Sequence, residues 1–238
     1  MELVIDIGNT RVKAGLFINN GLHKVLYPDT PTHHLQDAIG DQKIQKVIIS
    51  SVKKDVQQVR NYWEDHCPTW VLSKDTKLPI EIDYDTPETL GNDRIAGVVG
   101  GRFLFNSGPV LSIDIGTCIT FDILTAENHY LGGSISPGID LRYKSMNAFT
   151  SSLPLVEIRS MDSFIGNSTE TSISTGVING IAREIDGVIG QYEIQFEGLK
   201  TVICGGDARY FVNHLKKKIF ANQNLVLLGL HKILLFND

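Results

Sequence analysis

Short apolar runs separated by polar turn residues open the chain. The runs cover residues 3–5, 12–18 and 23–27, and Asn20 followed by Gly21 separates the last two. An Asn-Gly pair between apolar runs is a strong signal for a hairpin, because both residues accept the positive φ angles of a tight turn. The pattern therefore predicts a meander of three strands.

A mixed pattern follows the meander. The expected elements are a short helix, a buried strand, an amphipathic helix and a short strand, at residues 32–39, 46–50, 55–66 and 70–72. In the longer helix, Val56, Val59 and Trp63 lie on one stripe, as the helical period requires. The predicted order for this part of the chain is three strands followed by helix, strand, helix and strand.

The rest of the chain also alternates between segments with the helical period of hydrophobic residues and segments typical of strands. Helices are expected at residues 92–105, 141–149, 169–193, 207–215 and 230–236, and strands at 110–115, 120–124, 130–131, 202–204 and 225–228. Four glycines weaken the longest helix, although such spacing often lets a second helix pack closely. No linker divides the chain, and we place the boundary between two halves, 1–82 and 83–238, in the loop near residues 75–92.

Composition and charge narrow the class of protein. The 238 residues are 42% hydrophobic, which is enough to build a core without disulfides or a structural metal. A net charge of −5 argues against nucleic-acid binding by general electrostatics. Three scattered cysteines, an acidic start and no apolar run of about 20 residues predict a cytoplasmic protein with no membrane partner. The histidines show no metal-ligand spacing.

An internal repeat carries the strongest chemical signal. Residues 4–10 and 112–118 share an apolar residue, Asp, Ile, Gly and a polar residue, with Asp6 and Asp114 in equivalent places. Glycine lets a ligand approach the backbone, and the amides that follow can point at phosphate oxygens. A carboxylate beside a polyphosphate needs a cation between them. Two such turns would hold a nucleotide's phosphates; the alternative is two unrelated Asp-Gly turns.

A third turn, at residues 202–208, joins a strand to Gly205, Gly206 and Asp207. Two glycines at this place admit a base or a ribose against the backbone. Asp207 is open to two interpretations: it contacts the nucleotide, or it only caps a helix.

Taken together, these motifs resemble those of the acetate and sugar kinase/Hsp70/actin superfamily, and most closely the type III pantothenate kinases. The matching stretches run in order along the chain: DIGNTRVK at 6–13, YDTPETLGNDR at 84–94, DIGT at 114–117 with TFD at 120–122, GGSISPG at 132–138, TSSLP at 150–154, and IGNST at 165–169 with Gly176. Cys118, Cys204 and Asp207 depart from the family pattern near the expected nucleotide, which leaves the choice of nucleotide donor open.

The resemblance implies a fold and an activity. The fold would be α/β, with duplicated βββαβα halves of the actin-like, ribonuclease H-like kind around a nucleotide cleft. The activity would be transfer of the γ-phosphoryl group of ATP to pantothenate, with Mg²⁺ and a monovalent cation, K⁺ or NH₄⁺. The family forms homodimers, and the helix near residues 169–193 would build that interface.

The resemblance also implies roles for single residues. The ATP phosphates would be bound by Asp6, Ile7, Gly8, Asn9, Thr10, Arg11, Val12, Lys13 and Thr117. Asp114 would hold the monovalent cation. Pantothenate would be bound by Tyr84, Gly91, Asn92, Asp93, Arg94 and Thr169, with Asp93 as the catalytic base.

The chemistry of these residue types is compatible with the implied roles, but it also leaves other interpretations of the same residues open. An alcohol nucleophile needs a proton acceptor within hydrogen-bond reach, and the helix dipole would keep Asp93 ionised. Asp93 could instead be an ordinary carboxylate in a first helical turn, Arg94 a surface ion-pair partner and Thr169 a helix cap. Three rival functions also remain: a kinase for another small molecule, a non-catalytic regulatory relative, and a nucleotide hydrolase.

Overall fold

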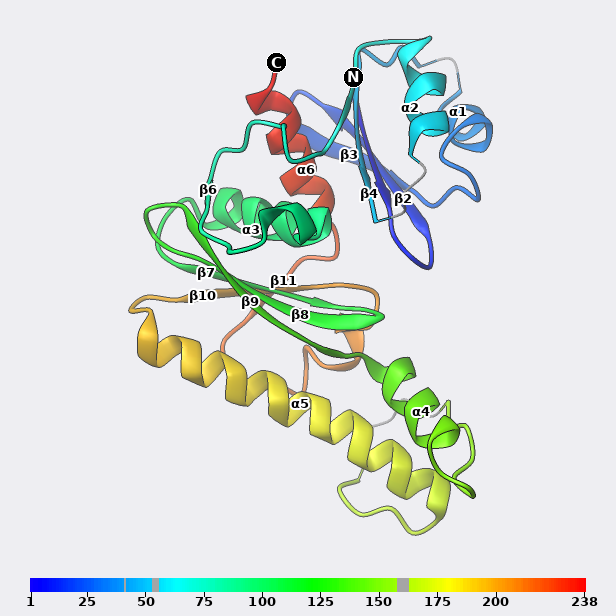
Figure 1. Cartoon of the computed structure of the whole chain (residues 1–238), viewed down its shortest axis with the longest axis vertical. Helices are drawn as coiled ribbons and strands as arrows, with labels where there is room; N and C mark the ends of the chain where they lie inside the picture. Colours follow the sequence, from blue (N-terminus) through cyan, green and yellow to red (C-terminus); the bar gives the residue numbers. More distant parts are fainter. Residues whose placement is uncertain (41, 53–55, 158–162) are drawn as a thin grey trace. The chain divides into compact units, whose positions relative to one another are not determined.

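The computed structural model describes residues 1–40, 42–52, 56–157 and 163–238 (Figure 1). The chain forms two compact units, which are described separately. The first comprises Met1–Asn106, Asn128–Leu131 and Asn224–Asp238, and the second Ser107–Glu127 and Gly132–Gln223. Among the described residues, no helix combines the length and the apolarity that crossing a membrane requires.

The first unit is built on a five-stranded sheet with the order β3-β2-β1-β4-β5. Its strands are β1 (Glu2–Ile7), β2 (Val12–Ile18), β3 (Gly21–Leu26), β4 (Lys46–Ser51) and β5 (Thr69–Val71). Strand β1 pairs with β2 antiparallel and with β4 parallel. The predicted hairpin between β2 and β3 is confirmed, but its turn lies one residue earlier than the Asn-Gly pair: Asn19 and Asn20 adopt φ angles of 49° and 63°, and Gly21 is the first residue of β3.

Two short helices cover one face of this sheet. Helix α1 (His33–Ile39) was predicted, and α2 (Gln57–Glu64) lies within the predicted helix, whose expected first residue, Asp55, lies outside the described residues. Buried residues from the strands and from both helices form one core, in which Trp63 is fully buried. The Trp63 indole also donates a hydrogen bond to the Pro31 carbonyl at 2.8 Å, so its polar atom is satisfied.

The C-terminal helix α6 (Leu225–Phe236) packs on the sheet and on α3 (Asn92–Phe105) within the first unit (Figure 1). The two helices approach closely, because a Cβ atom at Gly229 would lie 1.8 Å from the Ala96 carbonyl oxygen. The predicted strand at residues 225–228 is wrong. A short apolar run is compatible with a strand or with a buried helix, and this run continues to Phe236 as one helix that is buried on several sides.

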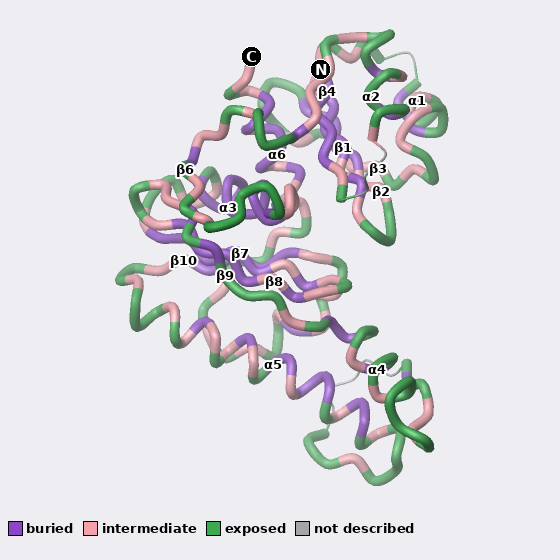
Figure 2. The backbone as a smooth tube through the Cα atoms, viewed as in Figure 1, coloured by how far each residue is buried: buried purple, intermediate pink, exposed green. Residues whose placement is uncertain are grey.

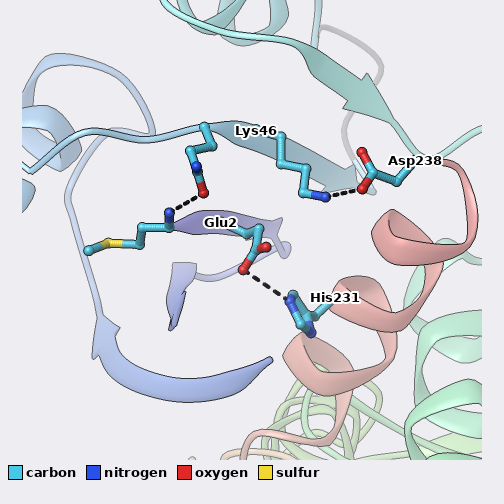
Figure 3. Close-up of polar contacts among 6 residues, drawn as sticks. Glu2, Lys46, His231 and Asp238 are labelled. Atoms are coloured by element: carbon cyan, nitrogen blue, oxygen red, sulfur yellow. Dashed lines mark hydrogen bonds and ion pairs between the residues drawn. The ribbon is translucent and has the colours of Figure 1, made fainter. Parts of the chain in front are cut away.

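A polar cluster fastens α6 to the start of the sheet (Figure 3). The ring of His231 is buried, stacks on Phe17 with 3.9 Å between ring centroids, and places Nε2 3.5 Å from the Glu2 carboxylate. Burial lowers the pKa of His231 below its usual 6.5, and the Glu2 charge offsets part of that effect. Beside it, Lys46 forms an ion pair with Asp238 at the end of the chain.

The second unit contains most of a six-stranded sheet with the order β11-β10-β7-β8-β9-β6. Its strands are β7 (Val110–Ile115), β8 (Cys118–Leu124), β10 (Lys200–Cys204) and β11 (Phe220–Ala221). Strand β9 (His129–Pro137) begins in the first unit, where it pairs with β6 (Glu81–Ile82), and continues in the second. The predicted strands are present, and β6 and β11 are additions too short to show in the pattern.

The two sheets repeat one topology. The order β9-β8-β7-β10-β11 matches β3-β2-β1-β4-β5 strand for strand. In both sheets the first strand of the repeat pairs antiparallel with the second and parallel with the fourth, as β7 does with β8 and β10. The duplicated α/β fold is therefore confirmed. The predicted boundary between halves remains a prediction, because the compact units divide the chain differently.

Helix α5 (Thr169–Gln195) covers one face of the second sheet, and α4 (Ile139–Ala148) packs beside it. Figure 2 shows buried and exposed positions alternating along α5, as expected for a helix that buries one stripe. Ser168 caps α5 in a capping box with Thr171. The long predicted helix is confirmed, and its glycines 176, 180 and 187 have open space where a Cβ would lie.

The predicted helix at residues 207–215 is wrong. The segment forms only a single 3-10 turn, η2 (Ala208–Tyr210), followed by further turns. Residues beyond it are held by side-chain bonds instead of helical ones, since the Asp186 carboxylate of α5 accepts the amides of Lys216 and Lys217 at 2.9 and 3.2 Å.

Candidate active site

The first Asp-Gly turn joins β1 to β2. The amide of Gly8 donates to the Arg11 carbonyl at 3.1 Å, and the side chains of Asn9 and Thr10 between them are exposed. Asp6 sits just before this turn, opposite Lys13 on β2. A carboxylate, a lysine and exposed turn amides at the end of a hairpin form an arrangement that can bind a polyphosphate together with a cation.

A further polar group lies in register with Asp6. Ser50 is its partner on the parallel strand β4, so the two side chains share one face of the sheet. Ser50 is fully buried, and its hydroxyl has no hydrogen-bond partner among the described residues. Sequence reasoning missed Ser50, although its place at the end of a buried strand beside an Asp-bearing strand was a usable signal.

The second Asp-Gly turn joins β7 to β8 in the other unit. The amide of Gly116 donates to the Cys118 carbonyl at 3.0 Å, and Thr117 at its tip is exposed. Asp114 lies opposite Thr120 on β8 and Cys204 on β10, as Asp6 lies opposite Lys13 and Ser50. The repeated motif thus occupies equivalent positions in the two sheets, which excludes the interpretation of two unrelated turns.

Two glycines allow the backbone to close around this second turn. Gly205 adopts a φ of 96°, and a Cβ there would lie 2.3 Å from the Ile115 carbonyl oxygen and 2.5 Å from Asp114 Oδ1. A Cβ at Gly138 would lie 2.1 Å from the Gly116 carbonyl oxygen. Only glycine fits such approaches without a shift of the backbone. Glycine is therefore needed at the residue after β10 and at the residue after β9, where the chain passes close to this turn.

Asp207 belongs to the same neighbourhood. Its amide donates to the Ile115 carbonyl at 3.0 Å, which joins the Gly205-Gly206 turn to the Asp114 turn. Its side chain makes no capping hydrogen bond to the following 3-10 turn. The capping interpretation of Asp207 is therefore not supported.

Asp114 is the candidate cation ligand at the second turn. Among the described residues, no group of three or more His, Cys, Asp or Glu side chains could bind a metal ion. A cation beside Asp114 would therefore need backbone carbonyls, hydroxyls or ligand oxygens to complete its shell. Oxygen ligands of this kind suit a hard ion such as K⁺ or Mg²⁺.

The start of α3 forms the second part of the candidate site, in the first unit. Gly91 is the residue before the helix, and Asp93 lies in its first turn. The Asp93 carboxylate folds back over this turn, where Oδ1 accepts the Arg94 amide at 2.9 Å and lies 2.5 Å from the place a Gly91 Cβ would take. The helix dipole favours a negative charge at this position.

Neighbouring residues enclose this helix start. The buried guanidinium of Arg94 lies over the Tyr84 ring at 5.8 Å, and the Tyr84 ring lies 6.0 Å from that of Tyr130. The Asn92 amide donates to the Leu72 carbonyl at 3.0 Å. The structure thus brings five of the six predicted substrate residues together, and the burial of Arg94 excludes the surface ion pair.

The sixth predicted residue, Thr169, lies in the second unit at the start of α5. It lines a pocket of about 720 Å³ between α4 and α5, together with Arg142, Ser145, Met146, Leu153, Ser172, Ile173, Gly176 and Val177. Ser168, not Thr169, is the capping residue of α5, so the alternative role for Thr169 is excluded.

The fold and the repeated turns place the chain in the actin-like class of duplicated α/β proteins. Solved structures agree at the level of fold. A Campylobacter jejuni protein named for the Baf family of transcriptional activators has a TM-score of 0.63 at 23% identity, covering 99% of this chain and 98% of that one. A ROK hexokinase from Thermus thermophilus has a TM-score of 0.52 at 12% identity, covering 98% and 97%.

The comparisons by sequence are more specific. A model of the type III pantothenate kinase family matches residues 2–191. Type III pantothenate kinases from Christiangramia forsetii and Cytophaga hutchinsonii are 42% and 39% identical, and each alignment covers 100% of this chain and at least 99% of the relative. The chain belongs to the type III pantothenate kinase family.

Proposed function

We propose that this protein transfers the γ-phosphoryl group of ATP to the primary hydroxyl of pantothenate, the first step of coenzyme A synthesis. The observation that carries the proposal is the full-length membership of the family together with the site at the start of α3. There, Tyr84, Gly91, Asp93 and Arg94 lie together in one unit, in the order that the family motif requires.

Residues 6–13 and Thr117 bind the ATP phosphates in this proposal. The amides of the exposed first turn and Lys13 would contact phosphate oxygens, and Thr117 would add a further contact. Mg²⁺ would neutralise charge on the phosphates beside Asp6, and the monovalent cation, K⁺ or NH₄⁺, would be held by Asp114. Phosphoryl transfer proceeds through a loose transition state, so positioning and charge neutralisation supply most of the catalysis.

Pantothenate binds at Tyr84, Gly91, Asn92, Asp93, Arg94 and Thr169, with Asn92 contributing through its backbone, and Asp93 accepts the proton of the attacking hydroxyl. The Asp93 carboxylate is suited to this role because one oxygen is fixed by the Arg94 amide, which leaves the other for the substrate. General base catalysis of this kind contributes roughly 10²–10⁴-fold to a rate. The Arg94 guanidinium would pair with the pantothenate carboxylate or with a phosphate.

A homodimer is the assembly that the second unit favours. Helix α5 offers open space at Gly180, and Phe149 and Ile165 in the same unit are 88% and 83% exposed. Contiguous patches of exposed apolar side chains are typical of surfaces that another protein covers. Sedimentation equilibrium tests this, since Gly180→Arg should yield monomers if α5 forms the interface. A Gly180→Arg protein that stays dimeric would contradict the proposal.

We further propose that the enzyme works in the cytoplasm.

The activity is tested by ADP release in a coupled assay with and without pantothenate, repeated without K⁺ or NH₄⁺. The proposal expects release that needs both. Release without any acceptor would indicate a nucleotide hydrolase, and release with another small alcohol in preference to pantothenate would indicate a different kinase. No turnover with ATP, Mg²⁺, K⁺ and pantothenate present would indicate a non-catalytic relative.

A further inference from the structure

The side chain of Asn92 is committed to the protein itself. Its amide nitrogen donates to the Leu72 carbonyl at 3.0 Å, and Leu72 is 2% exposed. Leu72 is in turn part of the sheet ladder, because its amide donates to the Ile49 carbonyl at 2.8 Å. A partly buried bond of this kind is costly to break, since the carbonyl would be left without its donor.

This bond connects two parts of the candidate active site through rigid structure. Ile49 lies on β4, and the next residue, Ser50, pairs in register with Asp6 on β1. Asn92 immediately precedes Asp93 at the start of α3. A short path of hydrogen bonds within the first unit therefore leads from the helix that carries the base to the strand that carries the first phosphate turn.

The first turn of α3 has no capping side chain of its own. Its capping residue is Gly91, which has no side chain to hold the first turn, and the hydrogen bond across the turn, from the Ile95 amide to the Gly91 carbonyl, is long at 3.3 Å. Glycine is accepted at this position, but it offers no side-chain oxygen to the free amides of the first turn. The Asn92 amide supplies from the sheet the restraint that a cap would supply from the helix.

We propose that Asn92 is a positioning residue: its side chain fixes the first turn of α3 to the sheet, and so sets the Asp93 carboxylate relative to the phosphate turn of the same unit. The inference rests on the proposed function for the role of Asp93. It differs from substrate binding by the Asn92 side chain, because a positioning residue acts on the rate of the chemical step and a ligand acts on affinity.

The test compares Asn92→Ala and Asn92→Asp with the unmodified enzyme by steady-state kinetics at saturating ATP. Asn92→Ala should lower kcat about 10-fold and change the KM for pantothenate less than about 2-fold, since small misplacements of a catalytic group are expensive in rate. Asn92→Asp should lower kcat further at neutral pH, because a carboxylate faces the Leu72 carbonyl. Its kcat relative to that of Asn92→Ala should rise as the pH falls and the new acid becomes a donor.

Asn237→Ala is the matched control. The Asn237 amide makes the same kind of bond in the same unit: it donates at 2.8 Å to the Lys77 carbonyl, in the loop after β5, and to the Ile233 carbonyl of α6. Its loss should lower the melting temperature about as much as Asn92→Ala does, with kcat unchanged. A KM for pantothenate raised 10-fold or more by Asn92→Ala with kcat retained would overturn the proposal, as would unchanged kinetics.

Hydrogen exchange separates this inference from the proposed activity. Peptides that cover residues 91–96 should exchange at least 10-fold faster in Asn92→Ala than in the unmodified protein, and Asn237→Ala should leave them unchanged. Equal protection in all three proteins would overturn the positioning role even if pantothenate is phosphorylated. Faster exchange with no turnover in the unmodified protein would support the restraint and refute the proposed function.

Discussion

Gly91 offers a direct way to move the predicted base without removing it. Its backbone, with φ −63° and ψ 133°, lies in a region that every residue adopts, so alanine fits without backbone strain. The added Cβ, however, would lie 2.5 Å from Asp93 Oδ1, whereas ordinary contacts begin near 3.4 Å. In Gly91→Ala the carboxylate must therefore retreat by about 1 Å, the difference between those two distances.

A displacement of this size is large enough to lower the rate of a catalysed reaction markedly. A misplacement of about 1 Å in a catalytic arrangement costs on the order of 10²-fold, and a tenfold loss corresponds to about 1.4 kcal/mol in the barrier. We expect kcat to fall between about 10-fold and 100-fold. Stability should change by no more than about 1 kcal/mol, because glycine is only a modest helix cap and alanine a poor one.

The assay is ADP release with saturating pantothenate and ATP, paired with thermal unfolding of the same samples. Gly21→Ala is the control, because its added Cβ meets the Ile18 carbonyl oxygen at an ordinary 3.5 Å in the same unit. The control should keep its kcat. If Gly91→Ala keeps its kcat within about 2-fold while melting normally, the position of the Asp93 carboxylate does not govern the rate and the reasoning fails.

Two further predictions concern the C-terminal helix. Gly229→Ala should force α6 away from the Ala96 carbonyl. We expect the free energy of unfolding to fall by about 1–3 kcal/mol and the melting temperature by roughly 3–10 °C. A melting temperature within a degree of the original would contradict the close packing. For His231, the folded pKa lies below the unfolded value of 6.5, so the unfolded chain takes up the proton first as the pH falls. His231 therefore contributes stability above pH 6.5 that is lost as the pH falls through the folded pKa. Melting curves should show this loss in the original protein and a smaller loss in His231→Gln; equal losses would refute it.

Local patterns predicted most of the fold because the responsible forces act over short stretches of the chain. The Asn19-Asn20-Gly21 turn fixed the first hairpin, and the helical stripe through Val59 and Trp63 fixed α2. The errors arose where tertiary contacts decide. The run at 225–228 became a helix because α3 and the sheet bury it on several sides, which no apolar count reveals.

For the candidate site too, the sequence indicated single residues but not the contacts that depend on the fold. The internal repeat indicated Asp6 and Asp114, because carboxylates in two matching strand-end turns have few purely structural reasons to recur, and the resemblance to the family motif indicated Asp93. It did not indicate that Ser50 shares a face with Asp6, since that depends on the register between β1 and β4. Nor did it reveal that the Asn92 amide reaches Leu72, twenty residues earlier in the chain. Roles toward ATP, cations and pantothenate remain predictions for these residues.

The proposed role of Asp93, to accept the proton of the pantothenate hydroxyl, is tested by the substitution Asp93→Asn. Asparagine keeps the shape and can still accept the Arg94 amide through its carbonyl oxygen, so the start of α3 should remain folded. Formation of phosphopantothenate, followed by mass spectrometry with ATP, Mg²⁺ and K⁺ present, should fall by roughly 10²–10⁴-fold with little change in melting temperature. A variant that forms the product at a rate within about 3-fold of the original would contradict the account.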